Sequence, residues 1–196
     1  METHRRSPSN ATALAPEEQR LSELWDEHVR CEFEIRSADA AVATMVEDAY
    51  VNHVPVMTGG SGHEQLREFY GKRFIPHIPP DRQVTPVSRT IGVDCVVDEL
   101  VVRFTHTTEM EWFLPGVPPT GKYVEVPLVV VVHFKDGKLA HEHIYWDQAS
   151  VLAQIGLLDP TALPVAGAEV ARKVLDPSLP SNTLIERAEQ QKKLKG

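Results

Sequence analysis

The feature that most constrains this chain is an abrupt change of pattern near Asp81. Before that residue, apolar side chains recur at the three- and four-residue spacing of helices. After it, β-branched residues dominate four segments that turn signals separate, namely 84–93, 95–112, 123–134 and 138–146. Helices followed by consecutive strands are typical of an α+β fold, in which neighbouring strands pair antiparallel.

The strand segments also predict how the sheet is covered. Residues 126–132 are almost wholly apolar, as expected of a strand with both faces buried. Asp136-Gly137 suits a tight type I′ turn between the last two strands. We therefore expect a curved antiparallel sheet that the N-terminal helices wrap into a cone, whose interior is a natural pocket for a small molecule.

The helical half begins at Pro16, a residue suited to a first helical turn. Apolar spacing predicts a long helix that ends near Arg36, and then a short helix over 39–46. A short strand over 49–54 is expected to end at a Thr58-Gly59-Gly60 break.

Ser61-x-x-Glu64 is a capping-box pattern that opens a further helix, which prolines 76, 79 and 80 stop. For the whole chain we expect a disordered leader over 1–14 and one domain over 15–160. Residues 161–196 are expected to form a C-terminal extension with a helix near 182–194.

Composition excludes several classes of function. The net charge is −8, so nucleic acid is not expected as a partner, because phosphate binding requires a basic patch. No apolar run approaches the roughly eighteen residues of a membrane span. Cys31 and Cys95 form neither a disulfide framework nor a zinc motif, which indicates reduced thiols in a cytoplasmic protein. No organic cofactor is implied, since the chain has no phosphate-binding glycine loop.

Four segments resemble a known family. They are the opening helix with Trp25, EDAYVNHVPVMTGGSGHEQLREFY, VVRFTHTTEMEW and EHIYWDQASVLAQIGLL. Together they resemble the nuclear transport factor two-like superfamily over roughly residues 17–158, and within it the SnoaL-like polyketide cyclase group. The likeness is greatest to SnoaL-like proteins described as carboxymethylenebutenolidase-related. The chain has no GxSxG or GxCxG nucleophile elbow of the α/β-hydrolases.

The resemblance implies a homodimer and a cone that hosts isomerases, cyclases, dehydratases, epoxide hydrolases or binding domains. It also implies that Asp147 acts as the acid/base, because SnoaL-like cyclases place a carboxylate near the end of the last strands, facing the cone. Asp147 is equally suited to cap the helix that follows it.

The last strand alternates His141, His143, Tyr145 and Asp147 with Glu142, Ile144 and Trp146. We expect the histidine face to meet the pocket. His143 would then move protons, and Tyr145 would donate a hydrogen bond to a developing oxyanion. His141, beside the hairpin, is expected to lie exposed.

His53 and His106 are further catalytic candidates, although a lone histidine among β-branched residues is more often a hydrogen-bonded core residue. Together with His143 and Glu109 they would suit a three-histidine, one-carboxylate metal site, an alternative that ligand types alone do not establish. Substrate-binding candidates are Tyr50, Glu109, Trp112 and Trp25.

The sequence thus favours a small-molecule enzyme that needs no cofactor and performs acid/base chemistry on a carbonyl compound or lactone. Isomerisation, cyclisation, dehydration and hydrolysis all remain open. Two alternatives are a non-catalytic ligand-binding or dimerisation module and a metal-dependent hydrolase or lyase.

Overall fold

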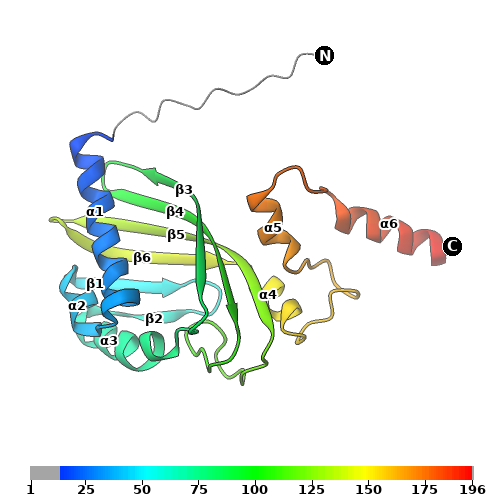
Figure 1. The fold of residues 1–196 in the computed structure, drawn as a ribbon, viewed down its shortest axis with the longest axis horizontal. Coiled ribbons are helices and arrows are strands. Elements are labelled where there is room, and N and C mark those ends of the chain that lie inside the picture. The colour runs from blue at the N-terminus through cyan, green and yellow to red at the C-terminus, as the bar shows by residue number, and fades with distance from the viewer. Residues whose placement is uncertain (1–13, 196) are drawn as a thin grey trace, which may run out of the picture.

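A computed structural model describes residues 14–195 of the chain (Figure 1). The predicted leader lies outside the described residues except for Leu14. The helices are α1 (Pro16–Arg30), α2 (Ala38–Ala43), α3 (Gly62–Glu68), α4 (Gln148–Gln154), α5 (Glu169–Leu175) and α6 (Thr183–Lys195). The strands are β1 (Met45–His53), β2 (Thr58–Ser61), β3 (Gln83–Ile91), β4 (Cys95–Thr105), β5 (Tyr123–Lys135) and β6 (Lys138–Trp146).

The six strands form one curved sheet in the order β2-β1-β6-β5-β4-β3. Neighbours pair antiparallel, except that β1 lies parallel to β6. The α+β prediction with a curved sheet is confirmed. The turn between β5 and β6 has positive φ at both Asp136 and Gly137, as a type I′ turn requires.

The predicted break at Thr58-Gly59-Gly60 is wrong, because these residues form β2 and pair with β1. Gly59 lies opposite Asn52, and a Cβ on it would come within 1.9 Å of the Val51 carbonyl oxygen. Only glycine allows the two backbones to approach so closely. The glycines are therefore needed inside the sheet.

Two further local expectations differ from the structure. The Ser61 side chain does not cap α3; instead its backbone N–H donates to Gln65 Oε1 at 3.0 Å. Strand β4 ends at Thr105 and not at Trp112, because the chain leaves the sheet for a loop over 106–122.

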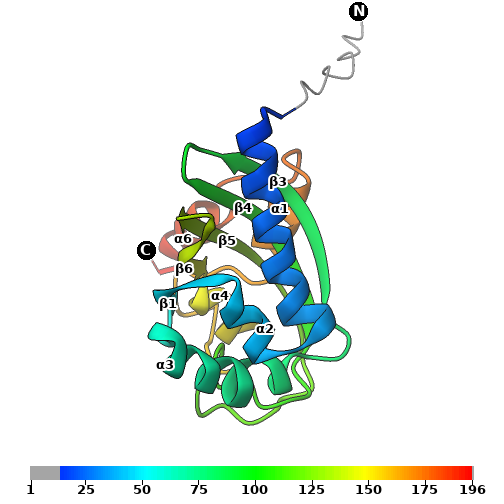
Figure 2. The ribbon, with the colours of Figure 1, turned by 90° about the vertical axis from the view of Figure 1, so that its left-hand side faces the viewer.

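Helix α1 crosses the concave face of the sheet, and α2 and α3 close one end of it (Figures 1 and 2). Continuous π-helical turns extend α1 to Ile35 and α3 to Phe74. The buried face of α1 carries Leu21, Trp25 and His28, so the helix packs an apolar stripe onto the inner face of the sheet. This arrangement leaves helices on one side of the cone and strands on the other.

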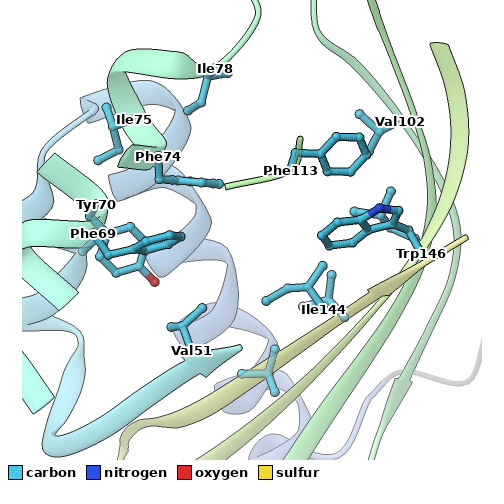
Figure 3. Packing of buried hydrophobic residues seen from close by; sticks show 14 of the residues in the cluster. Val51, Phe69, Tyr70, Phe74, Ile75, Ile78, Val102, Phe113, Ile144 and Trp146 are labelled. Carbon is cyan, nitrogen blue, oxygen red and sulfur yellow. The ribbon is translucent and has the colours of Figure 1, made fainter. Parts of the chain in front are cut away.

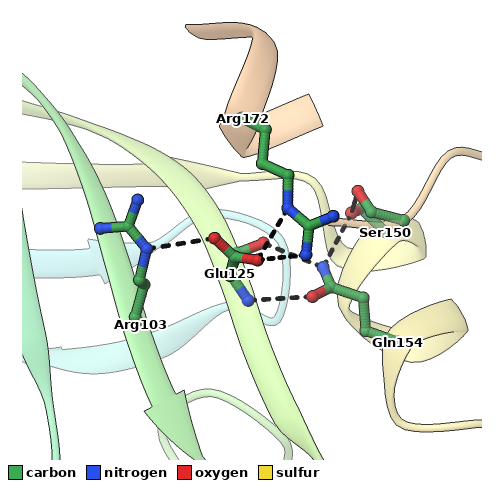
Figure 4. A network of polar contacts seen from close by, with 6 residues as sticks. Arg103, Glu125, Ser150, Gln154 and Arg172 are labelled. Atoms are coloured by element: carbon green, nitrogen blue, oxygen red, sulfur yellow. Dashed lines mark hydrogen bonds and ion pairs between the residues drawn. The ribbon is translucent and has the colours of Figure 1, made fainter. Parts of the chain in front are cut away.

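On the opposite face of the sheet, α5 is held by a polar network (Figure 4). Glu125 of β5 is buried and accepts hydrogen bonds from Arg172 of α5 at 2.6 and 3.0 Å and from Arg103 of β4 at 3.1 Å. Gln154 of α4 closes the network by pairing with the Glu125 backbone. Across residues 14–195, no helix is both long and apolar enough to cross a membrane.

Candidate functional site

A cavity of about 780 Å³ lies between α1, the α3 extension and the concave face of the sheet. Most of its wall is apolar. Figure 3 shows Tyr70 and Phe74 of the lining on the helical side, across from Phe113 of the 106–122 loop and Val102 of the sheet. A cavity of this size suits a drug-sized organic molecule.

Four buried residues with polar groups gather at one side of the cavity: His28, Glu32, Tyr70 and Glu142. His28 Nε2 lies 3.0 Å from Glu142 Oε1 and 3.3 Å from Glu32 Oε1. The Tyr70 hydroxyl lies 3.4 Å from Glu142 Oε1. Glu32, Tyr70 and Glu142 line the cavity, so two carboxyl groups of this cluster are within reach of a bound molecule.

Hydrogen bonds fix the orientation of the His28 ring. The Thr44 hydroxyl donates to the Ala41 carbonyl at 2.6 Å, so its oxygen must accept from His28 Nδ1–H at 2.6 Å. His28 Nε2 is left facing both carboxyl groups. Burial opposes a charge on His28, but Glu142 and Glu32 outweigh it and raise the pKa to about 10. The ring is therefore an imidazolium at neutral pH.

Burial also acts on the acids of the cluster. It raises the pKa of Glu32, and the negative charge of Glu142 adds to the effect, while His28 opposes it. The pKa of the Tyr70 hydroxyl is raised well above its usual value for the same reason, burial first and the glutamates second. Burial and the neighbouring Glu142 thus both favour the protonated form of Glu32.

His53 also lines the cavity and is buried. Its Nδ1 lies 3.3 Å from the Thr58 carbonyl oxygen, which can only accept, so Nδ1 carries the proton and Nε2 the lone pair. Burial lowers the His53 pKa to about 4, partly opposed by the Thr58 hydrogen bond. Unlike His28, this ring is neutral at pH 7.

The wall nearer the edge strand β3 carries a second polar group. Arg89 donates to both carboxylate oxygens of Asp98 at 2.7 Å and to Asp26 at 2.8 Å. Trp25 Nε1 donates to Asp98 Oδ2 at 2.8 Å. The hydrogen bond to Asp98 is the main cause that raises the pKa of Arg89. These bonds tie α1 to β3 and β4 beside the cavity.

The prediction that the histidine face of β6 meets the cavity is wrong. Glu142 and Ile144 line the cavity, and Trp146 joins the core on the same face. His143 and Tyr145 therefore point to the opposite face of the sheet. There, Tyr50 stacks on His141 with ring centroids 4.8 Å apart, and Tyr50 and Tyr145 are exposed. The physical reason is burial: the face with Ile144 and Trp146 is the more apolar one.

The remaining candidates also lie outside the cavity wall. Asp147 is exposed and caps α4, accepting from the Ser150 N–H at 3.1 Å. His106 is fully buried, with Nδ1 accepting from the Thr120 N–H at 3.4 Å. Burial lowers the His106 pKa. Glu109 is exposed, and its carbonyl accepts from His77.

The predicted metal set of His53, His106, His143 and Glu109 is not brought together. Within residues 14–195, the one group of three or more residues that places ligand-type atoms within 4.8 Å of one another is His28, Glu32 and Glu142. In that group, His28 Nε2 and Glu142 Oε1 are at hydrogen-bond distance, so a shared proton accounts for their geometry.

Three sequence candidates do line the cavity: His53, Trp112 and Trp25. The central residues His28, Glu32, Glu142 and Tyr70 were not among the candidates. A signal for two of them exists, because His28 and Glu32 occupy the apolar stripe of α1 four residues apart. Titratable residues in an apolar stripe indicate a buried polar cluster.

Comparisons with known proteins agree with this architecture. A family model described as SnoaL-like polyketide cyclase matches residues 19–155, and no curated protein sequence matches the chain. A proposed SnoaL-like polyketide cyclase from Jannaschia sp. CCS1 is similar in structure, at 22% identity and a TM-score of 0.57, over 76% of this chain and 99% of that one.

Two other solved structures are similar. AclR, a proposed hydroxylase from Streptomyces galilaeus, has 21% identity and a TM-score of 0.57, over 90% of this chain and 94% of its own. SalBIII, an epoxide hydrolase/cyclase-like enzyme in pyran ring formation, has 19% identity and a TM-score of 0.50, over 66% and 92%. At these identities the likeness shows the fold.

Proposed function

The chain belongs to the SnoaL-like polyketide cyclase family, and on that premise we propose that it is an enzyme that moves protons next to a carbonyl group of a small molecule in the cone. The observation that carries the proposal is the buried cluster of Glu32, Glu142 and Tyr70, with His28 behind them, in a mostly apolar wall. It places two carboxyl groups side by side, and the pKa of one of them, Glu32, is raised, whereas enolisation requires one acid and one base.

In the proposed step, the Glu142 carboxylate takes a proton from the carbon next to the substrate carbonyl. The electron pair of the broken C–H bond forms a C=C bond, and the carbonyl oxygen takes the proton of Glu32. The product is an enol, with Glu142 protonated and Glu32 ionised, so the net charge of the cluster does not change. Return of a proton to another carbon gives isomerisation, whereas attack of the enol on a second carbonyl closes a ring.

The other polar residues position this pair. His28 holds both carboxyl groups through one nitrogen, and Thr44 prevents its ring from turning over. The neutral His53 presents a lone pair on Nε2, which can accept a hydrogen bond from a substrate hydroxyl. Since the cavity wall is mostly apolar, each of these contacts is stronger than it would be in water.

The test is exchange of the C–H hydrogens next to a carbonyl, measured by proton NMR in D₂O with an aryl ketone such as 1-tetralone. The chain should accelerate exchange above the buffer rate. Glu142→Gln and Glu32→Gln should each reduce the enzymatic rate by about 100-fold or more, as expected for loss of a general base or acid. Both substitutions preserve side-chain size, and melting curves will show whether the variants fold.

The matched control is Asp147→Asn. It changes a carboxylate to an amide at the junction of β6 and α4. The residue is exposed and caps α4, a role that asparagine also fills. Its exchange rate should equal that of the unaltered chain. If the ketone binds but is not exchanged faster than in buffer, the acid/base proposal fails and the cavity is a ligand-binding site.

A further inference from the structure

One cation in the cavity wall, Arg82, has no acceptor for its N–H groups among residues 14–195. Arg82, just before β3, lines the cavity, and its guanidinium makes no hydrogen bond or ion pair with any residue of the described chain. Every other arginine in residues 14–195 has at least one such partner for its side chain. Five N–H donors are thus left for solvent or a ligand.

The guanidinium is nevertheless held in place. Its central carbon lies 3.7 Å from the centroid of the Phe33 ring, a cation–π contact that also covers one face of the group. The backbone before it is anchored, because both Asp81 carboxylate oxygens accept from the Thr105 N–H at 3.0 and 3.1 Å. Burial lowers the Arg82 pKa to about 10, with Glu32 opposing, so the group is charged but poorly hydrated at pH 7.

Five of the six acidic residues that line the cavity have a partner other than Arg82, and the sixth, Glu34, is exposed and makes no hydrogen bond or ion pair within residues 14–195. Asp98 and Asp26 bind Arg89, and Glu142 binds His28. A guanidinium over the face of an aromatic ring still has N–H groups along its own edge, and such an edge matches the two oxygens of a carboxylate. We propose that Arg82 is a carboxylate-binding subsite, and that the substrate is an apolar carbonyl compound carrying one carboxylate.

The charge of the wall favours a monoanion. Asp26, Asp98 and Glu142 line the same cavity, so a phosphate dianion would meet more repulsion than a carboxylate does. The substrate class rests on the proposed function, since only the acid/base cluster requires a carbonyl. The carboxylate-binding role of Arg82 does not rest on the proposed function, because it can be measured by binding alone.

The test is calorimetric titration with three probes of one shape: 2-naphthoate, its neutral amide 2-naphthamide, and 2-naphthyl phosphate. The unaltered chain should bind the carboxylate about tenfold or more tightly than the amide, as expected for a charge-assisted pair. In Arg82→Gln the preference should disappear, while amide binding stays within about twofold. Arg67→Gln, which removes an exposed arginine paired with Asp39, should keep the preference.

Equal binding of the carboxylate and the amide by the unaltered chain would overturn the proposal, as would a preference that survives Arg82→Gln. Stronger binding of the phosphate would overturn the choice of carboxylate. These outcomes are separate from the exchange test. If the chain prefers the carboxylate but does not accelerate exchange of the ketone hydrogens, the Arg82 subsite is supported and the catalytic proposal fails.

Discussion

His53, in the cavity wall, is a residue whose titration makes the stability of the fold depend on pH. Its ring packs against Phe69, Phe74, Trp112 and Trp146, with centroids 5.4 to 5.9 Å away. In the folded chain its pKa is about 4, whereas an unfolded histidine titrates near 6.5. Between these values the unfolded state binds more protons. The stabilising contribution is therefore complete above pH 6.5 and is lost as pH falls toward 4, by up to about 3 kcal/mol.

We accordingly expect His53→Phe to flatten the stability curve. The substitution keeps an aromatic ring among aromatic neighbours and removes the titration. Denaturant unfolding at pH 4.5 and 7 should show a smaller loss of stability on acidification than in the unaltered chain. His143→Phe, on the other face of the sheet, is the control and should leave the curve nearly as steep. If the His53→Phe and unaltered curves run parallel, the low pKa is wrong.

At the same scale, the candidate site could be predicted only in part. Trp25 and Trp112 were found because aromatic residues fill apolar walls, and His53 because it lies on an early strand. His28 and Glu32 were missed as site residues because a single helix does not reveal its distant partner. Glu142 comes from β6, more than a hundred residues later, and only the folded sheet brings it to 3.0 Å from His28.

At the scale of elements, strand β6 shows how far alternation can be trusted. Alternation correctly separates Glu142, Ile144 and Trp146 from His141, His143 and Tyr145. It does not say which set faces the cavity, because that depends on what covers each face. The type and order of most elements were predictable for a simpler reason, namely strong periodicity and clear turn residues. Strand β2 was not predictable, since glycines occur in turns and loops far more often than in strands.

The contact of α5 with β5 gives an element-scale prediction. Burial opposes the charge of Glu125, but Arg172 and Arg103 outweigh it and lower its pKa. Arg172→Gln removes one of the two partners of the buried Glu125 carboxylate and should lower the stability of the chain, modestly because Arg172 itself is exposed to solvent. Limited proteolysis should then cut faster between α4 and α5.

The control is Arg30→Gln, which breaks an exposed pair with Glu27 on α1. It should change stability less than Arg172→Gln does, because both of its charges are exposed, and it should leave the proteolysis rate unchanged. Equal cleavage rates in Arg172→Gln and the unaltered chain would show that α5 is held by other contacts.

At the scale of the whole molecule, the cavity is unfilled volume beside a packed core. Substitutions at two neighbouring valines can test whether this volume is open. Val102 lines the cavity, whereas Val101 is fully buried on the opposite face of β4. Val102→Phe should fill space, leave the melting temperature nearly unchanged and weaken 2-naphthoate binding by about tenfold or more. Val101→Phe should instead overpack its site and cost about 1–3 kcal/mol.

Equal destabilisation by the two substitutions would mean that the space beside Val102 is not open. Unchanged 2-naphthoate binding in Val102→Phe would mean that the ligand binds elsewhere.

The parallel pairing of β1 with β6 has a consequence for how the chain is made. β1 is synthesised early, but β6, its parallel neighbour in the sheet, is the last of the six strands to be synthesised. Until then, His28 and Glu32 lack Glu142, and the concave wall is incomplete. Long-range pairing of this kind slows folding and exposes apolar surface in the nascent chain. The cluster of His28, Glu32 and Glu142 can therefore form only once β6 has paired with β1, which makes it one of the last parts of the fold to be completed.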